Sequence, residues 1–150
     1  MTQSNDRARL QSQVHPYLFF EGRADEAIAF YRLALGAEVE MLMRYQDSPE
    51  APPPEKIPAD KQTKKKHASL RIGERTLSLS DGHCSGTPNF KGFAITLVMQ
   101  EVSEVERKFA ALAEGGQVVQ PLIETFFTPR FGMVVDRFGV MWMLYVPKAM

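Results

Sequence analysis

The sequence has 150 residues, of which 44% are hydrophobic and 10% aromatic, a size and composition typical of one domain with a buried core. Its 18 basic and 18 acidic residues leave no net charge, which disfavours nucleic acid or an anionic membrane as a partner. The single cysteine, Cys84, excludes an internal disulfide. The polar first residues contain neither a signal-peptide core nor a membrane span, so we expect a cytoplasmic protein.

The chain begins with a stretch, residues 1–13, that has almost no apolar side chains. We expect a disordered tail there and a single domain over residues 14–150. A short aromatic and apolar strand near residues 17–20 opens this domain. Apolar side chains then recur at three- and four-residue steps from Arg23 to Leu35, which predicts a helix with one buried face. A glycine ends this helix and a second strand follows, so the pattern predicts a βαβ unit.

The next segment, residues 46–66, contains five prolines and is long enough to be either a disordered loop or a lid. Residues 67–72 and 76–80 then alternate strictly between apolar and polar side chains, with a short turn between them. This pattern predicts a hairpin that is apolar on one face and polar on the other.

The second half of the chain repeats the order of the first. We expect a strand at 92–99, a helix at 103–113 that Ser103 caps, and three strands that end near residue 146. A period of this length indicates a duplicated βαβββ module, at about residues 15–81 and 92–146. The predicted fold class is therefore α+β, with the sheets of two modules arranged around one core or cleft.

Six motifs, taken in order, resemble a known family. They are PYLFFEGRADEAIAFYRLALGAEVE, HASLRIG, SLSDG, GFAITL, ETFF and DRFGVMWMLYV. Between Pro16 and Val146 the chain looks like the PhnB-like branch of the vicinal-oxygen-chelate superfamily, which includes glyoxalase I, extradiol dioxygenases and bleomycin-resistance proteins. The resemblance implies paired βαβββ modules in a glyoxalase fold, a curved mixed sheet around a cleft, and a homodimer.

In metal-dependent members of that superfamily, side chains from the first and last strands of each module bind a divalent ion. The resemblance places these positions at or beside His15, at Ser78 or Ser80, at Phe93 and at Met143. A phenyl ring and a thioether do not suit a hard ion, and one histidine with serines cannot supply three or four strong ligands. We therefore expect no metal and no other cofactor.

His67 is the candidate catalytic residue, because alternation places it on the polar face of the hairpin with Ser69, Ser78 and Ser80. An imidazole can act as acid or base near neutral pH. It can equally hydrogen-bond a hydroxyl at the start of a strand. Asp81 either orients this imidazole or caps the turn by bonding its own backbone.

In the second module, alternation places one set of side chains on the face that, by the resemblance, looks into the cleft. These side chains either form an apolar wall opposite the polar hairpin face or fill the core, and Trp142 falls on the other face, towards the helices. The set consists of Phe93, Ile95, Leu97, Met133, Val135, Met141, Met143 and Tyr145. The segment Glu124 to Phe127, with Arg130, lies near the expected cleft mouth and contacts either a ligand or another subunit.

The ligand-binding set expected from these patterns has eight members. They are His15, Tyr17, Phe19, His67, Ser78, Ser80, Phe93 and Met143.

The first hypothesis is a protein that binds a small organic molecule in the cleft without a metal. The second is a lyase, isomerase or dioxygenase-type enzyme with a noncanonical site around His15, Tyr17 and His67. The third is a ubiquinone-pathway methyltransferase, a label often given to similar proteins. It is disfavoured because the turn after the first strand, EGRADE, has one glycine where a nucleotide-type cofactor needs a glycine-rich turn.

Overall fold

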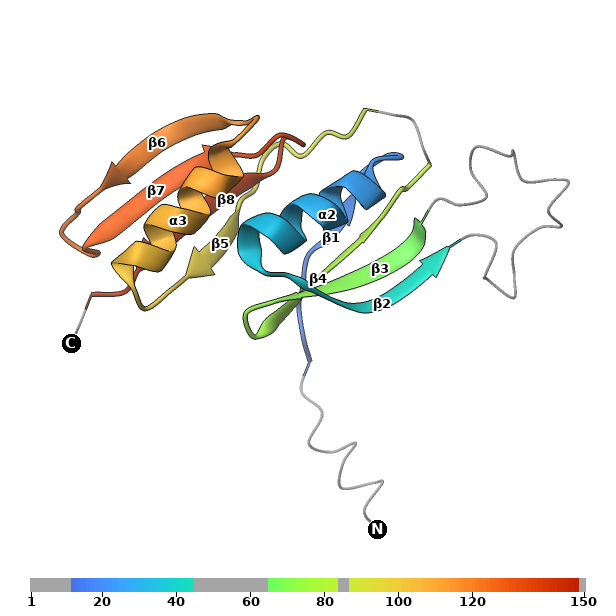
Figure 1. Ribbon diagram of the computed structural model, residues 1–150, viewed down its shortest axis with the longest axis horizontal. Helices are drawn as coiled ribbons and strands as arrows, with labels where there is room; N and C mark the ends of the chain where they lie inside the picture. Colours follow the sequence, from blue (N-terminus) through green and yellow to red (C-terminus); the bar gives the residue numbers. More distant parts are fainter. Residues whose placement is uncertain (1–11, 45–64, 84–86, 149–150) are drawn as a thin grey trace, which may run out of the picture.

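The structure, a computed structural model, describes residues 12–44, 65–83 and 87–148, without the side chains of 65 and 66. The segment 46–66, expected to be a disordered loop or a lid, lies outside the described residues except for its last two. Cys84 also lies outside them. The first module consists of β1 (Tyr17–Phe19), α2 (Ala24–Leu35), β2 (Glu38–Arg44), β3 (Lys65–Ile72) and β4 (Arg75–Ser80). The second consists of β5 (Ile95–Val98), α3 (Val102–Ala113), β6 (Gln117–Ile123), β7 (Arg130–Val135) and β8 (Met141–Val146) (Figure 1).

The two modules have the same topology. One sheet has the strand order β1-β4-β3-β2 and the other β5-β8-β7-β6. In each sheet the first and last strands of the module pair in parallel, and the remaining pairs are antiparallel. The predicted α+β fold of two βαβββ modules is confirmed.

Helix α2 lies where the apolar periodicity predicts it. Gly36 ends it in the left-handed conformation (φ 69°) and donates its backbone N–H to the Arg32 carbonyl, as expected of a glycine C-cap. At the other end, the backbone N–H of Ala24 donates to Asp81 Oδ1 at 2.8 Å. Asp81 follows β4 and is fully buried, and its carboxylate binds the start of a helix 57 residues away, a contact that the sequence did not suggest.

Helix α3 begins one residue earlier than predicted, at Val102. Glu101 is its N-cap residue, and the Glu101 side chain makes no capping hydrogen bond. The expected cap by Ser103 is therefore wrong, because Ser103 already lies inside the first turn of the helix. The two modules thus differ in how their helices begin.

The contact between the modules is aromatic and contains one buried carboxylate. The ring of Phe138 in module two packs against Phe20 and Phe30 of module one, at centroid distances of 5.6 and 5.7 Å. Beside it, Asp136 accepts hydrogen bonds from Tyr31 Oη at 2.5 Å and from Trp142 Nε1 at 2.9 Å. Burial, and next the neighbouring Asp136 carboxylate, raise the pKa of Tyr31 well above 10.0.

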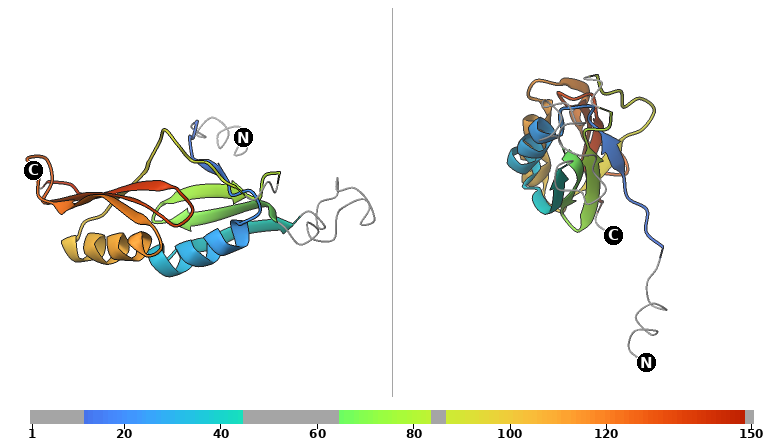
Figure 2. Two further views of the ribbon diagram at one scale, coloured as in Figure 1. Left: turned by 90° about the horizontal axis from the view of Figure 1, so that it is seen from above. Right: turned by 90° about the vertical axis from the view of Figure 1, so that its right-hand side faces the viewer.

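Both helices lie on the same side of the molecule. Figure 2 shows the two sheets side by side, with α2 and α3 covering one side, and no helix of the described residues covers the other side of either sheet. We call these uncovered sides the outer faces of module one and module two. A cleft with these faces as opposite walls is therefore not closed within one chain. Within the described ranges, no helix is long and apolar enough to span a membrane.

Candidate functional site

The outer face of module one carries the polar side of the predicted hairpin. Strand register forms one row from Met41 through Ser69 and Ser78 to Tyr17. In the neighbouring rows, Met43 pairs with His67 and Phe19 with Ser80. The alternating leucines of the hairpin lie on the other side, where Leu70 and Leu79 are fully buried. The predicted separation of polar and apolar faces is confirmed.

A hydrogen-bonded chain of side chains runs along this face. Tyr17 Oη lies 3.0 Å from His67 Nδ1, and His67 Nε2 lies 3.4 Å from Ser69 Oγ. The first distance is that of a normal hydrogen bond, whereas the second is at the long end of the range. The structure thus brings together Tyr17 and His67, two predicted site residues that are 50 positions apart.

Three rings stand next to one another on the same face. The Tyr17 ring is 5.0 Å from the Phe19 ring and 5.3 Å from the His67 ring, with interplanar angles of 41° and 32°. We call Tyr17, Phe19 and His67 the ring shelf. Tyr17 is 38% exposed and Phe19 is 54% exposed. Large aromatic side chains are usually buried more fully than this, so the shelf is a candidate surface for a bound molecule.

The two predicted serines occupy a different level of the same face. Ser78 and Ser80 are 2% and 4% exposed, because their short side chains lie in the same rows as the larger ring-shelf residues. Ser80 Oγ accepts a hydrogen bond from the backbone N–H of Gly82 at 3.1 Å. Ser78 and Ser80 therefore lie beneath the ring-shelf side chains on the outer face of module one. His15, in contrast, is exposed and lies two residues before β1.

The outer face of module two is mostly apolar. Its central row runs from Gln120 through Met133 and Met143 to Thr96. Phe131 and Tyr145 pair in the next row, beside Val98. The predicted methionine wall is therefore present on β7 and β8.

The predicted face of β5 is wrong. Ile95 and Leu97 pair with Trp142 and Leu144 and pack against the core on the helix side, so Thr96 and Val98 face outward. The run Ile95–Val98 has apolar residues on both faces, and only its pairing with β8 decides which face is covered. Phe93 precedes the strand, is 42% exposed and is not the register partner of Met143. Trp142 is fully buried on the helix side, as predicted.

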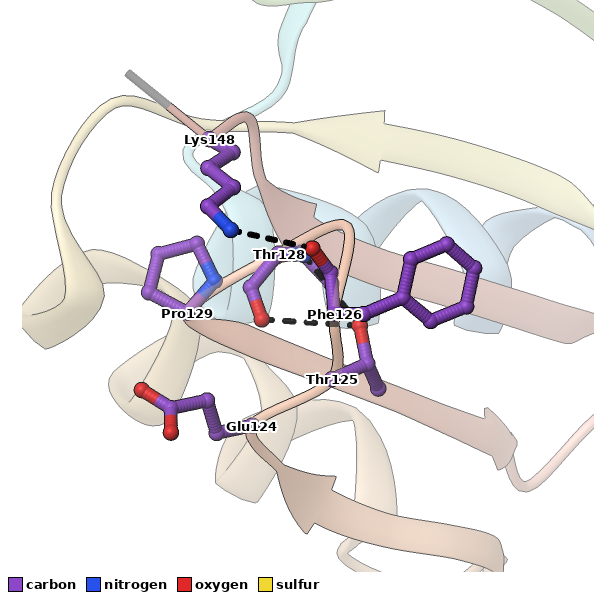
Figure 3. Close-up of a pocket in the computed structure, with 6 residues that line it drawn as sticks. All are labelled: Glu124, Thr125, Phe126, Thr128, Pro129 and Lys148. Atoms are coloured by element: carbon purple, nitrogen blue, oxygen red, sulfur yellow. Dashed lines mark hydrogen bonds between the residues drawn. The ribbon is translucent and has the colours of Figure 1, made fainter.

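A surface pocket lies at the turn between β6 and β7, and none of its lining residues belongs to the ring shelf (Figure 3). Its polar groups hold the turn: Thr125 N donates to the Thr128 carbonyl at 2.9 Å, and Lys148 Nζ donates to the Phe126 carbonyl at 3.1 Å. The side chain of Phe126 is 88% exposed. Because these groups are used to shape the loop, we do not assign the ligand site to this pocket.

The residues at the metal positions that the resemblance implies do not fit a divalent ion. In module one these are the exposed His15 and the hydroxyls of the buried Ser78 and Ser80, and in module two they are the exposed Phe93 and the Met143 thioether. One imidazole with hydroxyls, a phenyl ring and a thioether does not supply the set of imidazole and carboxylate donors that such ions prefer. Among the described residues, no group of three or more histidine, cysteine, aspartate or glutamate side chains is placed to hold a metal.

Two βαβββ modules, each with one helix and one four-stranded sheet, define the fold class of this protein. The family model of the glyoxalase/bleomycin resistance protein/dioxygenase superfamily matches residues 13–144, and the chain belongs to that superfamily.

Protein YjdN of Escherichia coli (strain K12) is 37% identical over 138 residues, which cover 89% of this chain and 94% of that protein. The crystal structure of PA1353 from Pseudomonas aeruginosa is 41% identical, with a TM-score of 0.78 over 93% of this chain and 100% of that one. A Bacillus cereus PhnB protein, described as a putative 3-demethylubiquinone-9 3-methyltransferase, is 23% identical, with a TM-score of 0.71 over 90% and 99% of the two chains. It shares the fold.

Sequence reasoning missed the part that Asp136 and Tyr31 play. Asp136 also accepts hydrogen bonds from the backbone N–H groups of Phe138 and Val140, at 2.9 and 3.1 Å. An aspartate three residues before a glycine is a recognisable turn signal, so this local role was open to prediction. The hydrogen bond between Asp136 and Tyr31, on helix α2 of the other module, could not be predicted from the local sequence.

Proposed function

We propose that the protein binds a small organic molecule on the outer face of module one, without the divalent ion used by metal-dependent members of the superfamily. The observation that carries this proposal is the ring shelf, in which exposed aromatic rings adjoin the hydrogen-bonded pair Tyr17 and His67. Ligand sites typically combine aromatic surface with a few oriented polar groups. Resistance proteins of the superfamily that sequester their ligand offer a comparable mode of action.

The proposed site needs a second wall, and we assign it to module two of a second copy of the chain. Within one chain the outer faces lie side by side, and both expose apolar side chains, including Phe19, Met41, Val98 and Phe127. A two-fold symmetric dimer, the commonest oligomer, would place each ring shelf against the methionine face of the other copy. Met143 and Phe93 then belong to the apolar wall, and His15, Ser78 and Ser80 to the polar one.

Native mass spectrometry with elemental analysis tests the proposal. We expect a dimer mass, an organic molecule that co-purifies, and no stoichiometric metal ion. A Phe19→Ser variant should lose the molecule, whereas Leu33→Ser, which removes an exposed leucine (89% exposed) from helix α2, should retain it. A monomer, or a molecule retained equally by both variants, would contradict the proposed site.

An enzyme is the second candidate, and the hydrogen bond between Tyr17 and His67 favours it, since such a pair can donate and accept protons. Incubating the wild-type protein with the molecule it retains, followed by NMR of the released compound, separates binding from turnover. New resonances that His67→Ala does not produce would establish catalysis.

We do not propose methyl transfer. A nucleotide-type cofactor normally places a polar group at the start of a helix after a glycine-rich turn. Here the turn from β1 to α2 contains one glycine, Gly22, and the buried Asp81 carboxylate already accepts a hydrogen bond from the first helical N–H. The methyltransferase description belongs to the Bacillus cereus protein.

A further inference from the structure

We infer that the ring shelf selects a neutral planar molecule with a hydroxyl group, such as a phenol or an enol, over an anion of the same shape. This inference deepens the proposed function and rests on it. Three features support it: the orientation of the rings, the hydrogen-bonding capacity of the side-chain chain, and the charges on the same face.

The rings favour a flat ligand. Tyr17 makes angles of 41° and 32° with its two neighbours, so neither of these two pairs is set edge to face. A planar conjugated molecule can contact more than one of them at once. Aromatic contacts of this kind contribute beyond the burial of area alone.

The chain from Tyr17 through His67 to Ser69 can bind a ligand hydroxyl with either tautomer of the His67 ring. If Tyr17 donates to His67 Nδ1, then Nε2 carries the proton and points it toward Ser69 Oγ. If Ser69 donates to Nε2, then Nδ1 donates to Tyr17 Oη instead. Either state leaves a donor hydrogen at one end of the chain and acceptor lone pairs at the other. A ligand hydroxyl both donates and accepts, whereas a carboxylate only accepts.

The long contact is the link of the chain that a ligand hydroxyl would replace. At 3.4 Å, the contact of His67 Nε2 with Ser69 Oγ is weaker than the 3.0 Å contact of Tyr17 with Nδ1. A ligand hydroxyl that reaches Nε2 therefore replaces a poor hydrogen bond, while Tyr17 continues to hold the imidazole in place.

The charged side chains described on this face do not favour an anion. Arg71 forms an ion pair with Glu38, and the neighbouring Glu40 accepts a hydrogen bond from Thr76 at 3.0 Å. Among the side chains that the structure describes here, carboxylates outnumber guanidinium groups, and Arg71 is already paired. An anionic ligand would add repulsion without gaining an unpaired cation from this set.

Fluorescence titration with three probes of one ring system tests the inference at neutral pH: 2-naphthol, naphthalene and 2-naphthoate. We expect 2-naphthol to bind about three- to tenfold more tightly than naphthalene, as one net hydrogen bond allows, and also more tightly than 2-naphthoate. Tyr17→Phe keeps the ring but removes the hydroxyl, so it should abolish most of the preference for 2-naphthol and change naphthalene binding less than about twofold.

His67→Ala should also remove the preference, whereas His83→Ala, which truncates an exposed histidine outside the shelf, should leave it intact. Tightest binding of 2-naphthoate, equal binding of 2-naphthol and naphthalene, or an unchanged preference in Tyr17→Phe would overturn the inference. If the protein retains its own molecule in native mass spectra but binds none of the probes, the ligand class is wrong and the proposed function stands. If the protein neither retains a molecule in native mass spectra nor binds any probe, the proposed function itself is wrong.

Discussion

The outer faces of the two modules have the same backbone and opposite chemistry. Corresponding rows contain Met41, Ser69, Ser78 and Tyr17 in module one, and Gln120, Met133, Met143 and Thr96 in module two. The helix sides are alike, since Leu70 and Leu79 in one module and Val134 and Leu144 in the other are all fully buried. Folding therefore constrains one side of each sheet, and the other side is left to differ according to what it contacts.

The largest expected effect concerns the contact that holds both outer faces on one side. Asp136→Ala would leave four buried donors, including Tyr31 Oη and Trp142 Nε1, without their acceptor. We expect a loss of about 3 to 5 kcal/mol in the free energy of unfolding, as is usual for a broken buried network. Urea denaturation measures it. Asp136→Asn, which keeps one carbonyl oxygen, should recover part of the loss. If Asp136→Ala is as stable as the wild type, the hydrogen bonds to Asp136 do not stabilise the fold.

The next effect separates the modules by the way their helices begin. Asp81→Ala removes the carboxylate that binds the first N–H of α2, and we expect it to cost about 1 to 2 kcal/mol. The midpoint of urea unfolding at constant slope reports this change. A loss below about 0.5 kcal/mol would mean that solvent replaces the cap and that Asp81 has little structural weight.

A designed metal site tests the register of module two. Met133→His, Met143→Glu and Thr96→His together place three strong ligands in one row of the sheet. We expect the triple variant to bind zinc at least about tenfold more tightly than any single variant, a difference of about 1.4 kcal/mol. In the matched control, Phe93→His replaces Thr96→His. Calorimetry that finds the control tighter would refute the pairing of β5 with β8.

A smaller effect of opposite sign is expected at α3. Glu101 is its N-cap residue, has an extended backbone (ψ 132°) and makes no side-chain cap. Glu101→Ser should supply the missing acceptor and stabilise the protein by about 0.5 to 1 kcal/mol. Glu101→Ala serves as the control. A melting temperature for the serine variant that does not exceed the alanine value would argue against an uncapped helix.

The smallest effect is confined to alkaline solution and involves Tyr31. Burial, then the Asp136 carboxylate, raise its pKa in the folded state, so the native protein keeps a proton that the unfolded chain loses near pH 10. This contribution is complete below that pH and is lost as the pH rises toward the folded-state pKa. Unfolding free energy should therefore fall above about pH 10, and less steeply in Tyr31→Phe. Parallel pH profiles of the two proteins would contradict this origin.

The parts of the fold that were predictable from sequence are those with a clear period. Strict alternation from Ala68 to Ile72 identified the polar and apolar faces of the first hairpin, and three- and four-residue steps located α2. The run Ile95–Val98 gave no such signal, because side chains on both of its faces are apolar or small. Its orientation depends on a parallel pairing with a strand more than forty residues later.

The candidate site was predictable as a set of residues but not as a geometry. His67, Tyr17 and Phe19 were expected on the ligand side, yet nothing local indicates that Tyr17 Oη reaches His67 Nδ1, since β1 and β3 are joined only through β4. For Asp81, the sequence suggested the His67 imidazole or its own turn as partners, and it gave no sign that the carboxylate accepts a hydrogen bond from the start of α2. Long-range pairing decides contacts that short-range patterns leave open.

The aromatic contact around Phe138 has a consequence for how binding would depend on concentration. With Phe20, Phe30 and Tyr31 packed on its ring, the two modules of one chain are held together, and one chain presents a single wall to a ligand. Under the proposed arrangement, subunit association and ligand binding form one linked equilibrium, in which each raises the apparent affinity of the other. The midpoint of a ligand titration then shifts to higher ligand concentration as the protein is diluted, in a manner that a preformed cleft within a monomer would not show.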